Sequence, residues 1–174
     1  MPVAPNVSVL CGTPTPNMID KIAIDKLENL IAMSRSLFRY VLIDVPAGFN
    51  PTSIAAAEAA STAFLVSMIN GAYEIDHMKR ALTIFRDWED MEARVKVVFT
   101  RVEPCDSCSK LELSQKLGYS VAGIIPNEYA IVSDAADKGQ MATDIRPDSA
   151  LSRQVDRLAD DIIGRQHRIR WGAL

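Results

Sequence analysis

The sequence predicts an α/β domain with a doubly wound, mainly parallel sheet and helices on both faces. Short runs rich in Val, Ile and Leu alternate along the chain with longer segments whose apolar residues have helical spacing. Nearly continuous apolar runs are typical of strands that are covered on both faces, as in a parallel sheet. The segments between the runs are long enough for the right-handed crossovers that join parallel strands.

The predicted strands are the runs at residues 7–11, 40–44, 63–68, 95–100 and 121–125. Between the first two runs, a helix is predicted on an apolar stripe made of Ile19, Ile22, Leu27, Leu30, Ile31 and Leu37. An Ala-rich helix is predicted over residues 54–60. A third helix has one stripe, assigned to the core, made of Ile75, Met78, Leu82, Phe85 and Trp88. The last helix is predicted over residues 149–163, with Asp148 as its N-cap.

Composition narrows the class of protein and its compartment. The chain has 174 residues, 48% apolar and 24% charged, which suits one globular domain with a single core. Its net charge of −3 argues against a role in binding nucleic acid. No apolar run reaches the roughly 18 residues of a membrane span, and the first residues lack a secretory pattern. Three cysteines without framework spacing predict reduced thiols and a cytoplasmic protein.

The segment from Tyr40 to Gly48 carries the most specific chemistry. Asp44 ends a predicted strand, at the edge where open parallel sheets bind their ligands. Its carboxylate can hold hydrated Mg²⁺, which prefers one or two carboxylates together with phosphate oxygens. Gly48 has no Cβ, so its backbone N–H can approach a terminal phosphate closely. The alternative interpretation is that Asp44 caps the next turn and Gly48 only permits the bend.

The string Ile43-Asp-Val-Pro-Ala-Gly48 resembles the Walker B and switch II segment of the MinD/ParA family of ATPases. Later stretches of the sequence resemble further segments of this family, in the order in which the family has them. Val98-Phe-Thr-Arg-Val-Glu-Pro104 resembles the family's strand-end segment near the adenine. Ile124-Ile-Pro-Asn-Glu-Tyr129 and Ala135-Ala-Asp-Lys-Gly139 resemble its Ile-Pro-x-Asp loop and the helix that ends in Gly. Within the family, Val7-Ser-Val-Leu-Cys-Gly-Thr-Pro14 and Ile125-Pro-Asn-Glu-Tyr129 are most similar to the CpaE/TadZ branch, which is associated with assembling and positioning Flp-type (Tad) pili.

The resemblance implies a site for ATP and Mg²⁺. Asp44 would bind Mg²⁺ through water, and Gly48 would contact the γ-phosphate, with Pro46 between them in switch II. The base site would be lined by Thr100, Arg101, Pro126 and Asn127. The plainer alternatives are that Arg101 is a solvated charge at a strand end and that Pro126 only ends its strand.

The phosphate-binding half of the family's site does not occur in this sequence. The family uses a Gly-rich loop with Gly-Lys-Thr/Ser, but none of the eight glycines here is followed by lysine. The resemblance therefore makes residues 1–164 the C-terminal portion of a MinD/ParA-like ATPase domain, followed by a basic tail over residues 165–174. The missing region could be truncated, separately encoded or lost, and we expect the chain alone to hydrolyse ATP poorly or not at all.

The function implied by the resemblance is an ATPase switch that organises pili, dimerises around ATP and is recruited from the cytoplasm to a cell pole. Its partners would be pilus or polarity proteins. A non-catalytic scaffold or polar landmark is the alternative, and a MinD-like division-site regulator is a further one. A parallel sheet that lacks a central strand also predicts self-association.

Other features carry weaker functional hypotheses. Cys105 and Cys108 form a single CxxC, which supplies two of the four ligands of tetrahedral zinc, so we interpret both as loop thiols. The tail contains only Ile169, Trp171 and Leu174 as large apolar residues. This is too little for the apolar face of a helix on a membrane surface, so peripheral membrane contact is not the interpretation we favour.

Overall fold

The computed structural model describes residues 2–4, 6–12, 23–69, 72–103 and 109–171. Of residues 2–4, 72 and 165–171 it describes the backbone only. The chain divides into two compact units, Met1–Ser61 and Thr62–Leu174, and each is described by itself. Among the described residues, no helix has both the length and the apolar content to cross a bilayer.

The second unit contains a parallel sheet with strand order β3-β4-β5. Its strands are β3 (Ala63–Met68), β4 (Val95–Val102) and β5 (Val121–Pro126). Both pairs are parallel, with Leu65 opposite Val97 and Val97 opposite Val121. The strands predicted at residues 63–68, 95–100 and 121–125 are therefore confirmed, and each is a mainly apolar run, as is typical of parallel strands.

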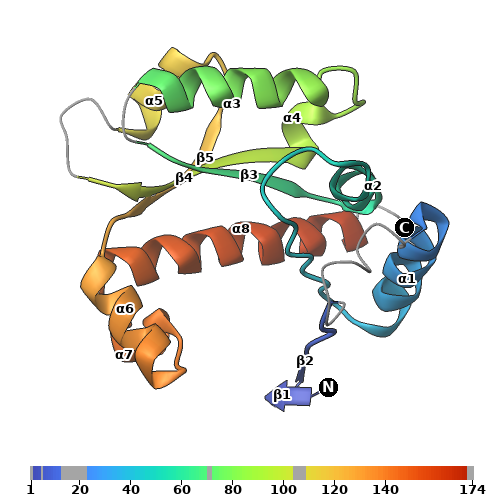
Figure 1. Ribbon diagram of the computed structural model, residues 1–174, viewed down its shortest axis with the longest axis horizontal. Coiled ribbons are helices and arrows are strands. Elements are labelled where there is room, and N and C mark those ends of the chain that lie inside the picture. Colours follow the sequence, from blue (N-terminus) through green and yellow to red (C-terminus); the bar gives the residue numbers. More distant parts are fainter. Residues whose placement is uncertain (1, 5, 13–22, 70–71, 104–108, 172–174) are drawn as a thin grey trace. The chain divides into compact units, whose positions relative to one another are not determined.

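Helices cover both faces of this sheet, as the sequence predicted (Figure 1). On one face lie α3 (Ala72–Ile84), α4 (Met91–Arg94) and α5 (Lys110–Leu117), and on the other lies α8 (Ala150–Trp171). The short helices α6 (Tyr129–Lys138) and α7 (Ala142–Ile145) connect β5 to α8. The doubly wound α/β class is thereby confirmed.

The core of the second unit lies between β4 and the helices on either side. Its most deeply buried side chains are Phe99, Leu113, Val95, Val97, Val121 and Ser152. The stripe predicted for α3 points inward, with Ile75, Met78, Leu82 and Phe85 all buried. Trp88 is half-buried, makes an edge-to-face contact with Phe85 at a centroid distance of 4.8 Å and lies under Arg94. The prediction that this stripe is core is confirmed.

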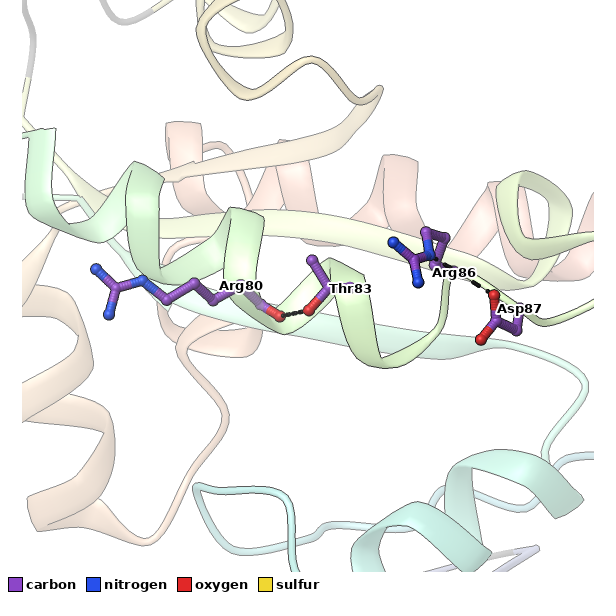
Figure 2. A network of polar contacts seen from close by, with 4 residues as sticks. All are labelled: Arg80, Thr83, Arg86 and Asp87. Carbon is purple, nitrogen blue, oxygen red and sulfur yellow. Dashed lines mark hydrogen bonds and ion pairs between the residues drawn. The ribbon is translucent and has the colours of Figure 1, made fainter.

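The exposed side of the end of α3 and of the turn that follows it is polar. Figure 2 shows the Thr83 hydroxyl donating to the Arg80 carbonyl at 2.7 Å and Arg86 beside Asp87 at 3.6 Å. All these side chains are exposed, so they contribute little to stability and keep this face of the helix solvated.

The first unit contains β1 (Pro2–Ala4), β2 (Val7–Ser8), α1 (Ile24–Leu37) and α2 (Pro51–Ala59). The two strands pair with each other in an antiparallel hairpin-like ladder, apart from the parallel sheet. The α1 and α2 helices pack together, and the Arg35 guanidinium donates to the Ala59 carbonyl at 2.9 Å. Ile19 and Ile22, which the sequence placed on the first helical stripe, lie outside the described residues.

Two of the predicted strands are wrong. Residues 9–11 have no regular structure, and residues 40–44 form no ladder with any described strand, although the chain there is apolar. Leu42, in the middle of the second run, is 89% exposed. A run of β-formers becomes a strand only when another strand satisfies its backbone N–H and C=O groups, and no described strand does so here.

The last helix also differs from its prediction at both ends. Its N-cap is Ser149, whose hydroxyl oxygen accepts from the Ser152 N–H at 3.0 Å, and not Asp148. The helix continues past Ile163 to Trp171, so residues 165–171 extend α8. Against the sheet, α8 packs closely at Gly123, where an added Cβ would lie 2.9 Å from the Leu158 side chain.

Candidate functional site

The carboxyl end of β4 contains a β-bulge at two of the predicted base-site residues. Phe99 pairs with Ile124 and Val102 pairs with Pro126, so two residues of β4, Thr100 and Arg101, lie opposite one residue of β5. Arg101 has a φ of +54°, a left-handed conformation that non-glycine residues seldom adopt. Bulges and such strained residues are over-represented beside binding sites, where they redirect a side chain.

The carboxyl end of β5 lies directly beside this bulge. The Asn127 N–H donates to the Val102 carbonyl at 3.0 Å, and its side-chain amide donates to the Glu103 carboxylate. Thr100 and Pro126 are half-buried, whereas Arg101 and Asn127 are exposed. The structure therefore brings Thr100, Arg101, Pro126 and Asn127 together from two strand ends, at the edge where parallel sheets bind ligands.

Glu128 fixes the other side of the loop that follows β5. Its carboxylate accepts the Leu151 N–H at 2.8 Å, which ties the loop to the first turn of α8. The Leu151 hydrogen bond lowers the pKa of the Glu128 carboxyl, with smaller contributions from the Ser149 hydroxyl, the Ala150 N–H and Arg153. Sequence reasoning assigned Glu128 no role, although it stands at the acidic position of the Ile-Pro-x-Asp pattern and could have been noticed there.

The junction before α8 is held by a buried hydroxyl. Ser152 has no exposed surface, and its side chain donates to the Arg146 carbonyl at 2.6 Å. The Ser149 hydroxyl lies 3.0 Å from it. Asn127 and Glu128 are thus fixed to β4 on one side and, through Leu151, to a rigid helix start on the other.

Asp44, Pro46 and Gly48 form the other group of predicted site residues, in the first unit. All three are exposed and lie in a segment without helix or strand. Gly48 has a φ of +111°, a conformation that essentially requires glycine. The cap of α2 is Asn50, whose side chain accepts the Ser53 N–H at 2.8 Å, so Asp44 does not cap that helix. The alternative in which Gly48 only permits a bend remains open.

Other candidate sites find less support. Cys105 and Cys108 lie outside the described residues. Among the residues that are described, no group of three or more His, Cys, Asp and Glu side chains could hold a metal ion. Asp44 supplies one exposed carboxylate, a donor that suits Mg²⁺ with its remaining waters. An open cavity of about 470 Å³ between β5 and α8 is lined by Gly123, Arg157 and Asp161 among others, and by none of the predicted site residues.

No protein-family model matches the sequence, and no curated protein matches it either. Solved structures do match in fold. The ParA family ATPase from Chlorobium tepidum TLS superposes with a TM-score of 0.70 and 17% identity, over 82% of this chain and 58% of that one. The septum site-determining protein MinD from Pyrococcus horikoshii OT3, solved with Mg-ADP, superposes with a TM-score of 0.70 and 16% identity, over 87% of this chain and 61% of that one.

MinD from Aquifex aeolicus, in a MinC:MinD cell division complex, gives a TM-score of 0.67 and 21% identity, over 83% of this chain and 60% of that one. At these identities the likeness concerns the fold, and each of the three structures is considerably longer than its counterpart here. The chain thus has the α/β fold of the MinD/ParA ATPases and spans about 60% of the length of these solved structures.

Proposed function

We propose that this chain is part of a MinD/ParA-like ATPase switch of the CpaE/TadZ kind, which localises or assembles Flp-type pili. The observation that carries the proposal is the meeting of Thr100, Arg101, Pro126 and Asn127 at two adjacent strand ends. These residues were selected from motifs far apart in the sequence, and they come together in a fold shared with ParA and MinD ATPases.

In the proposed site, the strand-end cluster holds the base. The Asn127 backbone is fixed by Val102 and the Glu128 carboxylate by Leu151, so the loop is set in place before any ligand arrives. The left-handed Arg101 lies in the bulge before the last pair of the ladder, and the residue is exposed. Exposed polar groups on a fixed backbone suit a planar, hydrogen-bonding ring such as adenine.

A separate proposed element, in the first unit, is the segment from Asp44 to Gly48. The exposed Asp44 carboxylate would hold Mg²⁺ through water, and the Cβ-less Gly48 would let its N–H reach a terminal phosphate. Bound Mg·ATP would supply the energy of phosphoryl transfer, with catalysis by positioning and charge stabilisation. Because no glycine is followed by lysine, we propose that hydrolysis and ATP-dependent dimerisation require a phosphate-binding loop that this sequence does not contain.

The experiment is a substitution in the gene at its native locus. Asp44→Asn removes the charge that would hold Mg²⁺ and keeps the shape of the side chain. If the protein is a pilus switch, we expect this variant to abolish surface pili and polar foci at unchanged protein level. Asp76→Asn, at an exposed position on α3, is the matched control and should leave piliation normal. Normal pili in the Asp44→Asn strain would overturn the proposal.

A non-catalytic scaffold or polar landmark is the second candidate, favoured by the missing Gly-Lys pair. It predicts that deletion of the gene abolishes pili whereas Asp44→Asn does not. A MinD-like division role is the third candidate, and for it the MinD complexed with MinC is the relevant fold neighbour. Misplaced septa on deletion, with pili intact, would favour that role over both others.

A further inference from the structure

Glu103 and Asn127 join the ends of β4 and β5 through their side chains. Glu103 directly follows the last residue of β4, and Asn127 directly follows the last residue of β5. The Asn127 side-chain amide donates to one oxygen of the Glu103 carboxylate. The Asn127 backbone N–H donates to the Val102 carbonyl at 3.0 Å, so the end of β4 holds both the backbone and the side chain of Asn127.

The Glu103 carboxylate fixes the way in which the Asn127 amide faces. An amide has an NH2 group that donates and a carbonyl oxygen that accepts, whereas an ionised carboxylate only accepts. If the amide turned over, its carbonyl oxygen would meet the Glu103 carboxylate, and the two acceptors would repel each other. The NH2 group therefore stays on the side of Glu103. The carboxylate accepts from the N–H bond that points away from the amide oxygen, because that oxygen repels it.

The remaining edge of the Asn127 amide matches adenine. This edge consists of the carbonyl oxygen and the N–H bond beside it, so an acceptor lies next to a donor. Adenine presents the complementary pair, because its N6 amino group donates and its N7 accepts, and asparagine contacts these two atoms together in other complexes. Guanine presents O6 and N7, which both accept, so its O6 would face the carbonyl oxygen of the amide.

We propose that Glu103 is a positioning residue that makes the proposed base site select adenine over guanine. It does so by holding the Asn127 amide with its acceptor–donor edge toward the base. The inference rests on the proposed function, in which Asn127 lines the base site, and Glu103 acts only through Asn127. Without the carboxylate the amide can turn over and present its NH2 group to O6 of guanine, so the choice between the bases is lost.

The first test follows the Asn127 side-chain NH2 group by NMR in the purified chain without ligand. Glu103→Gln keeps the shape of the side chain and replaces a charged acceptor by a neutral one, which accepts more weakly. We expect this variant to move the NH2 proton that faces residue 103 upfield. Glu89→Gln removes another exposed carboxylate, in the turn after α3, and should leave the NH2 resonances in place. Resonances that Glu103→Gln also leaves in place would overturn the proposal.

The second test compares adenosine with inosine, whose ring presents the same O6 and N7 acceptors as guanine. Both nucleosides are uncharged, so the loss of a carboxylate charge does not by itself favour either. We expect the parent chain to bind adenosine at millimolar concentrations, with a Kd about tenfold below that for inosine. Glu103→Gln should bring the two Kd values within about twofold of each other, and Asn127→Ala should do the same. NMR titration of each chain measures both Kd values.

The ratio of the two Kd values separates positioning from folding, because a general loss of structure would weaken both nucleosides alike. Adding Glu103→Gln to Asn127→Ala should change neither Kd further, as expected for a residue that acts only through its partner. A further change in the double variant would overturn the proposal, and so would an undiminished preference for adenosine in Glu103→Gln.

Failure of the proposed base site has its own signature. In that case Glu103→Gln still moves the NH2 resonances, but neither nucleoside shifts any resonance of the parent chain at millimolar concentrations. That result would overturn the base site, and the role of Glu103 with it. Adenosine binding that Asn127→Ala weakens and Glu103→Gln does not would keep the base site and overturn only the positioning role.

Discussion

Glu128 shows how one side chain can organise a loop. It follows directly after the residues predicted to hold a base, and its carboxylate accepts a hydrogen bond from the first turn of α8. Asn127, its neighbour, is fixed to the end of β4 instead. Removing either contact would leave the Pro126–Glu128 backbone free to move while the sheet stays intact.

The lowered pKa of Glu128 has a consequence for stability in acid. Because the pKa of the folded state lies below the ordinary value of 4.5, the charged carboxylate stabilises the fold above that pH and loses this contribution as the pH falls through the folded pKa. Glu128→Gln should therefore be less stable than the parent near neutral pH, and the difference should shrink as the pH falls below the ordinary value of 4.5 and through the lower folded pKa. Urea unfolding of both chains at a series of pH values measures this difference in the free energy of unfolding.

The control for this titration is Glu89→Gln, which removes an exposed carboxylate from the turn after α3. Its unfolding midpoint should follow the parent at every pH. A Glu128→Gln chain that is as stable as the parent near neutral pH would show that the charge of the Glu128 carboxylate contributes nothing to the fold.

At the scale of elements, the strands of the parallel sheet were predictable from the sequence, but the bulge at the carboxyl end of β4 was not. Strands β3, β4 and β5 are mainly apolar runs of the kind that is typical of a parallel sheet, and the structure extends β4 from its predicted end at Thr100 to Val102. The runs at residues 7–11 and 40–44 look the same in sequence but do not join this sheet. Whether a run pairs depends on a second strand, and the apolar pattern of one run does not show that. The resemblance to the MinD/ParA family named the residues that meet at the strand ends, and parallel strands bring them together because their carboxyl ends share one edge of the sheet.

The bulge at Arg101 could not be predicted, since arginine carries no sequence preference for a left-handed backbone. It is testable for that reason. Arg101→Gly should stabilise the chain by about 1 kcal/mol or leave it unchanged, because glycine adopts a positive φ without steric cost. Arg101→Val should destabilise it by about 1–2 kcal/mol, because a β-branched residue tolerates that φ poorly. Chemical denaturation of both variants compares them with the parent, and equal stability of the two would argue against the bulge.

At the scale of the whole molecule, the two units differ in how well they bury apolar surface. Among the side chains that the structure describes, most of the buried ones lie in Thr62–Leu174, and those of Met1–Ser61 are Ile31, Ser53, Ala55 and Ala56. Many large apolar residues between Val7 and Phe49 are exposed in the first unit. A unit with so small a core has little free energy to hold it closed.

Limited proteolysis of the intact chain tests this difference. We expect early cleavage at residues 38–50, which are extended and exposed, and late cleavage within β4 or β5. Mass spectrometry of the first fragments locates the cuts. First cuts inside residues 95–102 would contradict the assignment of the stable core to the second unit.

The part of the ATPase fold that this chain covers bears on its proposed function. A fold shared with ParA and MinD ATPases, over about 60% of their length, holds the strand-end cluster and the Asp44–Gly48 segment, but no Gly-Lys-Thr/Ser loop. Under the proposed function, a lysine from such a loop would contact the β- and γ-phosphate oxygens, so we expect these residues alone to bind a triphosphate weakly.

The central claim is that this chain carries part of an ATP site and not the whole of it. Isothermal titration of the purified 174-residue chain with Mg·ATP measures this directly. We predict no saturable binding at micromolar concentrations, and the same result for the Asp44→Asn variant. Saturable micromolar binding that Asp44→Asn weakens would contradict the claim, because it would mean that these residues hold the nucleotide without a phosphate-binding loop.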